Sequence, residues 1–438
     1  MLVVRGRRIV LFDGERPASI HIDRGRITAI GGDADVPAGA DIVDVGDLVV
    51  SPGVVDTHVH VNEPGRTEWE GFESATRAAA AGGVTAIVDM PLNSVPPTIT
   101  AAALDEKRRA ARGQCHVDVG CWGGVVPGHD ASIEPLVDAG VRGFKCFLVP
   151  SGVDEFQPVD ERQLRLAMPV LARRHVPLLV HAESPGRIAM HRGQVGSYRD
   201  YAATRPAAAE VDAIELMARL ARDTGARVHV VHVSSAGGVD AIAGAQASGA
   251  PITGETCPHY LTFAAAEVPD GATEYKCAPP IRDGEDREAL WRGLRSGTLS
   301  LVASDHSPAP AALKLPGDFV RAWGGVASIE LALAAVWTGA RAHGFSTLDM
   351  ARWMSEAPAS LAGWSARKGR LAPGYDADLV VWDADRDFTV EAHHLQQRHK
   401  ITPYAGRRLR GVVRMTFVRG ERVWDNGRLR TPASGQWL

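Results

Sequence analysis

The chain has 438 residues, of which 45% are hydrophobic and 23% are charged, the composition of a globular protein with a large core. Its formal net charge is -4, and its Lys and Arg residues are dispersed, which argues against a nucleic-acid partner. No apolar stretch is long enough for a signal peptide or a membrane span, so no membrane partner and a cytoplasmic location are expected. The five cysteines include no Cys-x-x-Cys pair, and we interpret them as reduced thiols.

The two ends of the chain have similar patterns. Residues 1–51 and residues 366–438 both consist of short strand-like runs separated by turn residues. Neither segment alone has enough strands to be stable, so we expect them to pair into one small β-sandwich domain. Residues 52–365 would then form a second domain.

Eight short apolar or β-branched runs lie in this second segment, most of them separated by Ala-rich stretches with helical periodicity. The runs are VVDTHVH, TAIVDM, HVDVGCW, GFKCFLV, PLLVHAE, RVHVVHVSS, PITGETCPH and SLVASDHSP. Eight strand-helix units in about 250 residues match a (β/α)8 barrel better than a doubly wound sheet. The sequence therefore predicts an α/β protein, a TIM-like barrel joined to a small β-sandwich domain.

The helix after the first run can be predicted in more detail. Thr67 and Glu70 have the spacing of a capping box at its start, and Gly82-Gly83 supplies a stop at its end. We expect this helix to join the first strand of the barrel to the second.

His58 and His60 are two positions apart in the run VVDTHVH. On a strand their imidazoles project from the same face, while Thr57 and Val59 point the other way. Two nitrogen ligands on one face suit a divalent metal. A hydrogen-bonded histidine pair in a half-buried strand is the alternative for an isolated His-x-His.

Four more residues of ligand type fall at the carboxyl ends of other predicted strands, where active sites of such barrels are built. They are Lys145, His181, His232 and Asp305. The two-residue alternation directs each of these side chains into the barrel. His229 has the opposite parity to His232, so we expect it to face the surrounding helices in a structural role.

Lys145 lies in the apolar run GFKCFLV, where an ammonium costs several kcal/mol unless it is paired or neutralised. A buried ion pair is one interpretation. In the other, the neutral amine reacts with carbon dioxide to give a carbamate, whose two oxygens can bridge two metal ions. Together with Asp305 and a bridging hydroxide, the carbamate would reduce the four charges of two divalent ions to roughly +1.

The order His-x-His, Lys, His, His, Asp resembles the ligand set of the binuclear amidohydrolase superfamily, and the fuller motifs resemble those of the allantoinases. No ligand position of the superfamily is missing. The resemblance extends from Gly53 to Arg407, and its motifs are specific only in combination. They include GVVDTHVHVNEPGRTEWEGFESATRAAAAGGVTAIVDMPLNSVPPT, GFKCFLVPSG, LLVHAES, TCPHYL, KCAPPIRD, LVASDHSP and HKITPYAGR.

This resemblance implies a metal-dependent cyclic amide hydrolase with two divalent ions per chain. Zinc is the expected metal, and cobalt and manganese are alternatives that the same ligands accept. One ion would be held by His58, His60 and Asp305, and the other by His181 and His232.

Lys145, carboxylated by carbon dioxide to N6-carboxylysine, would bridge both ions by the same resemblance. Asp305 would take a proton from the attacking hydroxide and deliver it to the departing ring nitrogen. His259 and His306 adjoin ligand residues in the sequence, and we expect them to support those ligands.

The substrate contacts follow in part from the resemblance, which implies hydrogen bonds from Ser307 and from the backbone of Cys277 to the ring. Asn93 and Ser151 lie in loops at the ligand end, where they are candidates to contact the ureido tail of allantoin. A structural role in a turn is the alternative for both.

The residues beside the ligands favour allantoin, opened to allantoate in purine (urate) catabolism. Dihydroorotases carry an arginine and an asparagine where this chain has Asn62 and Leu92, although Arg66 and Asn93 are near in the sequence. The loop VPSGVDEF lacks the tyrosine typical of hydantoinases and dihydropyrimidinases, which remain the main alternative. A further alternative is a non-catalytic relative that keeps the barrel only as a scaffold, and the complete ligand set argues against it. Relatives of this kind are dimers or tetramers, so a homo-oligomer is expected.

Overall fold

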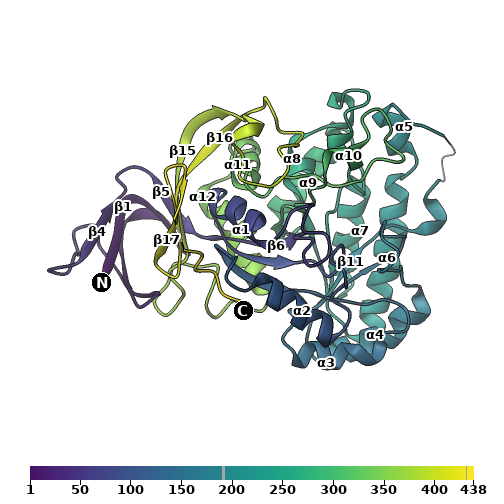
Figure 1. Ribbon diagram of the computed structural model, residues 1–438, viewed down its shortest axis with the longest axis horizontal. Helices are drawn as coiled ribbons and strands as arrows, with labels where there is room; N and C mark the ends of the chain where they lie inside the picture. The colour runs from purple at the N-terminus through teal and green to yellow at the C-terminus, as the bar shows by residue number, and fades with distance from the viewer. Residues whose placement is uncertain (190–192, 431) are drawn as a thin grey trace.

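The computed structural model describes residues 1–189, 193–430 and 432–438. A sheet built from both chain ends lies on one side of the molecule, and a barrel with its surrounding helices lies on the other (Figure 1). No helix of the described part of the chain is both long and apolar enough to cross a membrane.

Strands from both ends of the chain form a single sheet, which confirms the expected pairing of the two terminal segments. The central junction is an antiparallel pairing of β5 with β15, in which Val50 lies opposite Val381. The order is β18-β17-β16-β15-β5-β1-β2-β3, with β4 paired to β1. The strands are β1 (Leu2–Leu11), β2 (Gly14–Asp23), β3 (Arg26–Gly31), β4 (Asp41–Asp44), β5 (Val49–Pro52), β15 (Leu379–Thr389), β16 (Arg408–Val418), β17 (Glu421–Asp425) and β18 (Arg428–Leu429).

Parallel strands form the barrel, and each of the eight predicted runs contains one of them. Strands β8 and β9 are separated only by Trp122 and follow one another at one position of the barrel. A parallel bridge from Val59 to His306 joins the first strand to the end of the last and closes the barrel. The strands are β6 (Val54–Val59), β7 (Val84–Asp89), β8 (Asp118–Cys121), β9 (Gly123–Gly124), β10 (Phe144–Phe147), β11 (Leu178–His181), β12 (Val228–Val230), β13 (Ile252–Thr256) and β14 (Leu301–Val302).

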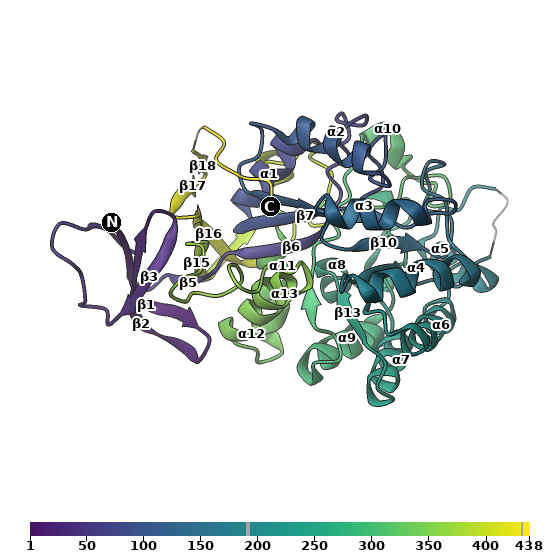
Figure 2. The same ribbon diagram turned by 90° about the horizontal axis from the view of Figure 1, so that it is seen from below.

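Helices between these strands pack around the outside of the barrel (Figure 2). Their inner faces and the outward-facing strand residues share one apolar core. The helices are α1 (Phe72–Ala81), α2 (Ala101–Ala111), α3 (Ile133–Asp138), α4 (Glu161–Arg173), α5 (Tyr198–Ala203), α6 (Ala207–Thr224), α7 (Ala236–Ala247), α8 (Pro258–Thr262), α9 (Gly284–Ser296), α10 (Ala311–Lys314), α11 (Ala332–Ala342), α12 (Thr347–Ala351) and α13 (Ala357–Leu361).

Helix α1 begins later than the sequence pattern predicts. The capping box of Thr67 and Glu70 is wrong, because the helix starts at Phe72 after Gly71, which has a φ of 95°. The carboxylate of Glu63 accepts the first helical N–H, from Phe72, at 2.8 Å. A distant acceptor therefore replaces the local one, whereas the helix ends at Gly82 as predicted.

Candidate metal centre

A cavity of about 500 Å³ opens at the carboxyl ends of the barrel strands, where the sequence places the site. The five predicted ligands that line it are His58, His60, His181, His232 and Asp305. Lys145 is buried beside this group, with its Nζ 5.0 Å from the centre of the Phe147 ring. The structure thus brings all six predicted ligand residues together.

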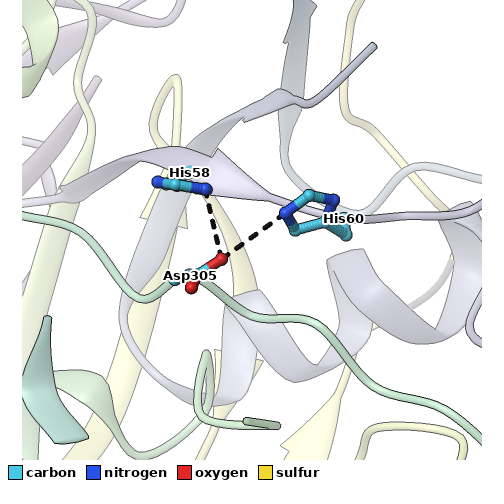
Figure 3. A group of neighbouring side chains, drawn as sticks. All are labelled: His58, His60 and Asp305. Carbon is cyan, nitrogen blue, oxygen red and sulfur yellow. Dashed lines mark ion pairs between the residues drawn. The ribbon is translucent and has the colours of Figure 1, made fainter. Parts of the chain in front are cut away.

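His58, His60 and Asp305 form the tightest group (Figure 3). The Asp305 Oδ1 atom lies 3.1 Å from His58 Nε2 and 3.4 Å from His60 Nε2. One potential ligand atom from each residue lies within 4.8 Å of the other two, a spacing compatible with one shared ion.

The second group consists of His181, His232 and Lys145. His181 Nδ1 lies 3.1 Å from His232 Nε2. Among the described residues, neither His232 Nδ1 nor Lys145 Nζ has a hydrogen-bond partner, although both atoms are buried. Buried polar atoms without partners are rare, so these two atoms are suited to contact a bound group at a metal centre.

Burial favours the neutral forms of four candidate ligands. It lowers the pKa of His60, His181 and His232 below the ordinary histidine value. It also lowers the pKa of Lys145 to about 8. Neutral imidazole is the form that binds a metal, and a less basic lysine is more easily deprotonated, so both effects favour metal binding over a set of charged side chains.

Asp305 behaves in the opposite way. Burial would raise its pKa, but the neighbouring His58 and His60 hold that pKa well below the ordinary aspartate value. Asp305 is therefore ionised across the physiological range and supplies the negative charge of the first group.

Glu255, on β13, holds His58 from the side away from Asp305. Its Oε1 atom lies 2.6 Å from His58 Nδ1, and its Oε2 atom lies 3.0 Å from His229 Nε2. This contact fixes the His58 ring so that Nε2 faces the cavity. The sequence analysis missed Glu255, although a carboxylate inside an otherwise uncharged strand was a signal for such a role.

His229 faces the barrel interior, so its predicted outward orientation is wrong. Its Nδ1 atom lies 2.7 Å from the hydroxyl of Thr253, one strand away. A Cβ at Gly254 would point outward, at Ile242 of helix α7. Neighbouring residues of a strand point to opposite faces, so the side chains of Thr253 and Glu255 point into the barrel. The predicted parity failed because His232 lies beyond the end of β12 and has a φ of 44°.

Glu183 holds His181 in the same manner. Its Oε2 atom lies 2.6 Å from His181 Nε2, and Arg205 donates to both of its oxygens. Burial would raise the pKa of Glu183, but His181 and Arg205 lower it to about 2. Glu183 follows His181 by two residues in the sequence, a same-face spacing that could have revealed it.

Three residues that line the cavity have strained backbones. Asn93, His232 and Asp305 have φ values of 69°, 44° and 46°, in the left-handed region that glycine prefers. Such a conformation costs about 1–3 kcal/mol per residue and persists where the surrounding structure enforces it. The turns after β7, β12 and β14 therefore direct these side chains into the cavity at an energetic cost.

His306 supports the site through its backbone, as expected for a residue next to a ligand. Its carbonyl accepts the N–H of His60 at 2.8 Å. Its Nδ1 accepts N–H groups of Ser328 and Ile329 at 3.1 and 3.3 Å, which leaves the proton on Nε2, 3.7 Å from the Glu70 carboxylate. The last strand is thus fixed against the first.

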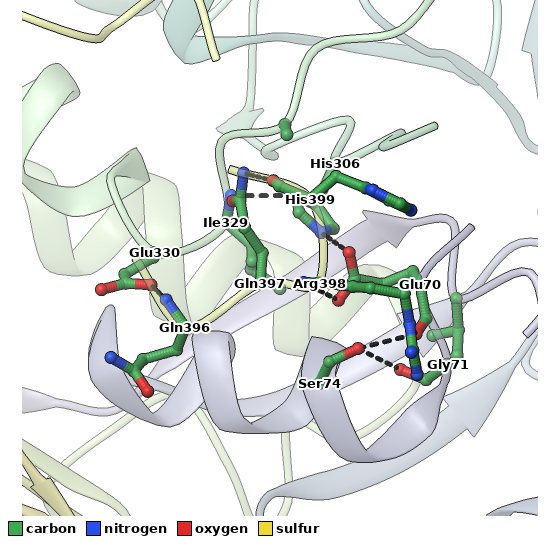
Figure 4. A network of polar contacts seen from close by, with 12 residues as sticks. Glu70, Gly71, Ser74, His306, Ile329, Glu330, Gln396, Gln397, Arg398 and His399 are labelled. Carbon is green, nitrogen blue, oxygen red and sulfur yellow. Dashed lines mark hydrogen bonds and ion pairs between the residues drawn. The ribbon is translucent and has the colours of Figure 1, made fainter. Parts of the chain in front are cut away.

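A segment from the C-terminal part of the chain completes this network (Figure 4). Glu70 is fully buried, and its Oε1 accepts the backbone N–H of Arg398 at 3.1 Å. The Arg398 guanidinium donates in turn to the Glu70 carbonyl. The connection between β15 and β16 thereby holds the residues that fix His306.

His259 is buried beside Asp305 and has no partner for either ring nitrogen among the described residues. Cys257, His259 and Asp305 form a second group with metal-ligand spacing. Burial raises the pKa of Cys257 well above its usual range, so the thiol keeps its proton. This group shares Asp305 with the group of His58 and His60, so it does not supply a separate set of ligands. The supporting role predicted for His259 stays a prediction.

The four predicted substrate contacts, Asn93, Ser151, Cys277 and Ser307, all line the cavity. Two of them already have partners. The Ser151 hydroxyl donates to the carbonyl of Phe156 at 2.7 Å, and the Cys277 carbonyl accepts the Tyr201 hydroxyl at 2.8 Å. In contrast, Asn93 Oδ1 has no partner within the described ranges of the chain.

Arg66 cannot serve as a free cationic anchor in this arrangement. Its guanidinium pairs with Glu155 at 2.5 Å and donates to the carbonyl of Asn93 at 2.9 Å. It also stacks on Trp69, with the guanidinium carbon 5.3 Å from the ring centre. Arg66 is therefore not available to bind a substrate carboxylate as the arginine of the dihydroorotases would.

Replacing Glu255 by Gln should weaken metal binding by about 10- to 100-fold, because losing a partner that orients a ligand has effects of this size. Titration with a competing chelator measures the affinity. Glu210→Gln is the matched control, since Glu210 is equally buried and pairs with Arg282 and Ser234, not with a histidine. Equal affinities in both variants would contradict the role given to Glu255.

Comparison with known proteins identifies the family. A model of the amidohydrolase family matches residues 49–423. The chain belongs to the amidohydrolase family. This amidohydrolase is 50% identical to the allantoinase of Streptomyces avermitilis over 433 residues, which cover 98% of the chain and 97% of that relative. It is 40% identical to the allantoinase of Arabidopsis thaliana, over 99% of the chain and 90% of that relative.

Solved structures give the same result for the fold. The amidohydrolase chain matches the L-hydantoinase (dihydropyrimidinase) of Arthrobacter aurescens with a TM-score of 0.94 and 32% identity, over 100% of this chain and 99% of that one. The predicted family and the predicted barrel fold are therefore confirmed.

Proposed function

We propose that this amidohydrolase is an allantoinase, which hydrolyses the hydantoin ring amide of allantoin to give allantoate in purine (urate) catabolism. The observation that carries the proposal is the 50% identity to a named allantoinase over nearly the full length of both chains. The identity to the structurally matched L-hydantoinase is lower, at 32%, and a shared barrel does not fix the substrate.

The residues at the cavity fit two divalent metal ions, with zinc as the first choice and cobalt or manganese as alternatives. His58, His60 and Asp305 would hold one ion, and His181 and His232 the other. Support comes from the spacing of the first group and from the unpartnered, buried Nδ1 atom of His232. When bound, divalent ions lower the pKa of water and polarise a carbonyl oxygen.

Lys145 would bridge the two ions after carboxylation by carbon dioxide at Nζ. The supporting observations are that Nζ is buried without a hydrogen-bond partner in the described chain and that its pKa is lowered by burial. A free ammonium with no partner is costly at this position, whereas an anionic carbamate would supply two metal-binding oxygens.

Asp305 would move the proton during ring opening. As water adds to the ring carbonyl carbon, Asp305 Oδ1 accepts the proton that the water releases. As the bond between carbon and nitrogen breaks, the same atom returns this proton to the departing nitrogen. The low pKa of Asp305 leaves it ionised and ready to accept the proton at the start.

Asn93 and Ser307 are the preferred substrate contacts in this proposal. Both line the cavity, and Asn93 Oδ1 is free to accept an N–H group of the ureido tail. The Ser307 hydroxyl and the backbone of Cys277 would hydrogen-bond the ring. Ser151 is weaker as a contact because its hydroxyl is used within its own loop.

We also expect a cytoplasmic homo-oligomer, a dimer or a tetramer. This expectation rests on the resemblance of the sequence to a family whose members form dimers or tetramers. Light scattering on the purified protein measures the mass of the assembly, and a monomer would contradict it.

The proposal is tested by measuring ring opening of allantoin, hydantoin, dihydrouracil and dihydroorotate with the purified protein, while bound metal is quantified. We expect allantoin to have the highest kcat/KM, with about two metals per chain. A higher kcat/KM on hydantoin or dihydrouracil would support the proposed metal centre but reject allantoin as the preferred substrate. A protein that binds no metal and opens none of these rings would contradict the proposed enzymatic function.

A further inference from the structure

One side of the cavity is built by residues 320–325, here called the cavity wall. All six residues line the cavity, and none of them is a candidate metal ligand. In the proposed function, the amide that is broken lies beside the metal ligands. A lining segment without ligands is therefore suited to face the rest of the substrate, which includes the substituent on the ring.

Two lysines hold the cavity wall through its backbone, and one of them, Lys276, also lines the cavity. Lys276 Nζ donates to the carbonyls of Val320 and Ala322 at 3.0 and 2.5 Å. Lys314 Nζ donates to the carbonyls of Trp323 and Gly325 at 3.3 and 2.6 Å. Four carbonyls of one short segment are thus fixed by two ammonium groups.

The wall is also tied to a predicted substrate contact. The N–H of Gly325 donates to the carbonyl of Lys276 at 2.7 Å, and the N–H of Ser307 donates to Val326 at 3.0 Å. Gly325 has a φ of 140°, and a Cβ there would lie 2.4 Å from the carbonyl oxygen of Ser307. The packing leaves no space for a side chain, so the position of the wall and the position of Ser307 are coupled.

This arrangement is costly because the two lysines form no ion pair with any carboxylate in the described chain. Burial lowers the pKa of both Lys276 and Lys314 to about 8. Arg205 opposes the positive charge of Lys276 and Asp318 favours it, and Lys276 in turn opposes the charge of Lys314. In the described chain both ammonium groups donate only to backbone carbonyls of the wall, so the cost of burying them is offset by contacts that order this segment.

We propose that Lys276 and Lys314 are positioning residues that fix the cavity wall and thereby select hydantoin rings by their substituent. The inference rests on the proposed function, which supplies a ring with a ureido tail. Neither lysine touches the scissile amide in this scheme. Their loss should therefore change substrate binding more than the chemical step.

The test compares Lys314→Met and Lys276→Met with the unmodified protein on allantoin and on unsubstituted hydantoin. We expect the KM for allantoin to rise about tenfold in each variant, while kcat and the KM for hydantoin change less than about threefold. Bound metal should stay unchanged. Lys276 is only partly buried, so its replacement remains informative if Lys314→Met does not fold.

Arg295→Met is the matched control, because Arg295 also donates to a backbone carbonyl, that of His343 at 2.6 Å, but does not line this cavity. Equal losses on both substrates, a fall in kcat alone, or no change would overturn the inference. If the unmodified protein does not open allantoin, the proposed function fails and takes this inference with it. If the unmodified protein opens allantoin and the KM of both lysine variants is unchanged, the inference is rejected while the proposed function stands.

Discussion

Replacing Asp305 by Asn should lower kcat for ring opening by about 10³-fold or more, because general acid-base catalysis contributes 10²- to 10⁴-fold and a charge beside two histidines is lost as well. The amide is nearly isosteric, but it cannot accept a proton and return it. Steady-state kinetics with allantoin measure the effect.

The Asp305→Asn experiment needs a control for general damage to the fold. Asp118→Asn serves, since Asp118 is fully buried and pairs with Lys368 beneath the terminal sheet. We expect Asp118→Asn to lower stability while kcat of the folded fraction changes little. If Asp305→Asn retained kcat within about tenfold, another group would have to move the proton.

Replacing Lys145 by Met should have two opposite effects. Activity should fall to background because the bridging ligand is lost and metal binding fails. The metal-free protein, in contrast, should become more stable by about 2–3 kcal/mol, since an unpartnered ammonium with a lowered pKa is replaced by an apolar side chain of similar size. Metal analysis and denaturant unfolding of metal-free protein measure these effects.

Lys107→Met provides the contrast for this stability change. Lys107 is equally buried, but its Nζ pairs with Asp89 at 2.6 Å and donates to the carbonyl of Met90 at 3.0 Å. Breaking that pair should lower the free energy of unfolding by about 3–5 kcal/mol. If Lys145→Met destabilised the metal-free protein as much as Lys107→Met does, the ordinary buried ion pair would be the better account of Lys145.

The periodicity of the sequence predicted the barrel because strand alternation and helical spacing are local properties. The same rule placed His58, on β6, and His60, directly after this strand, on the same side. The rule failed at the strand ends, where the left-handed backbone of His232 removes the alternation, and the interior orientation of His229 was missed for that reason. The division of the chain at residues 52 and 365 stays a prediction.

The contacts that orient the ligands could not be predicted in the same way, because they join distant parts of the chain. Glu255 on β13 meets His58 on β6, which lies two strands away around the barrel, and Arg398 reaches Glu70 from the C-terminal part. Glu183, two residues after His181, carried a local signal that named its partner, whereas the buried carboxylate of Glu255 indicated a role without indicating which histidine it meets. The start of helix α1 was missed because its acceptor, Glu63, lies outside the predicted capping box.

The terminal sheet has a consequence for synthesis of the protein. Strand β5 leaves the ribosome early, and it pairs with β15 through contacts such as Val50 opposite Val381. Strand β15 follows the barrel in the sequence, so it is made only after the whole barrel. Until then the edge of β5 that pairs with β15 remains open, and open strand edges favour aggregation. Expression at low temperature, which weakens apolar association between unfinished chains, should therefore raise the yield of folded chain more than changes on the barrel surface would.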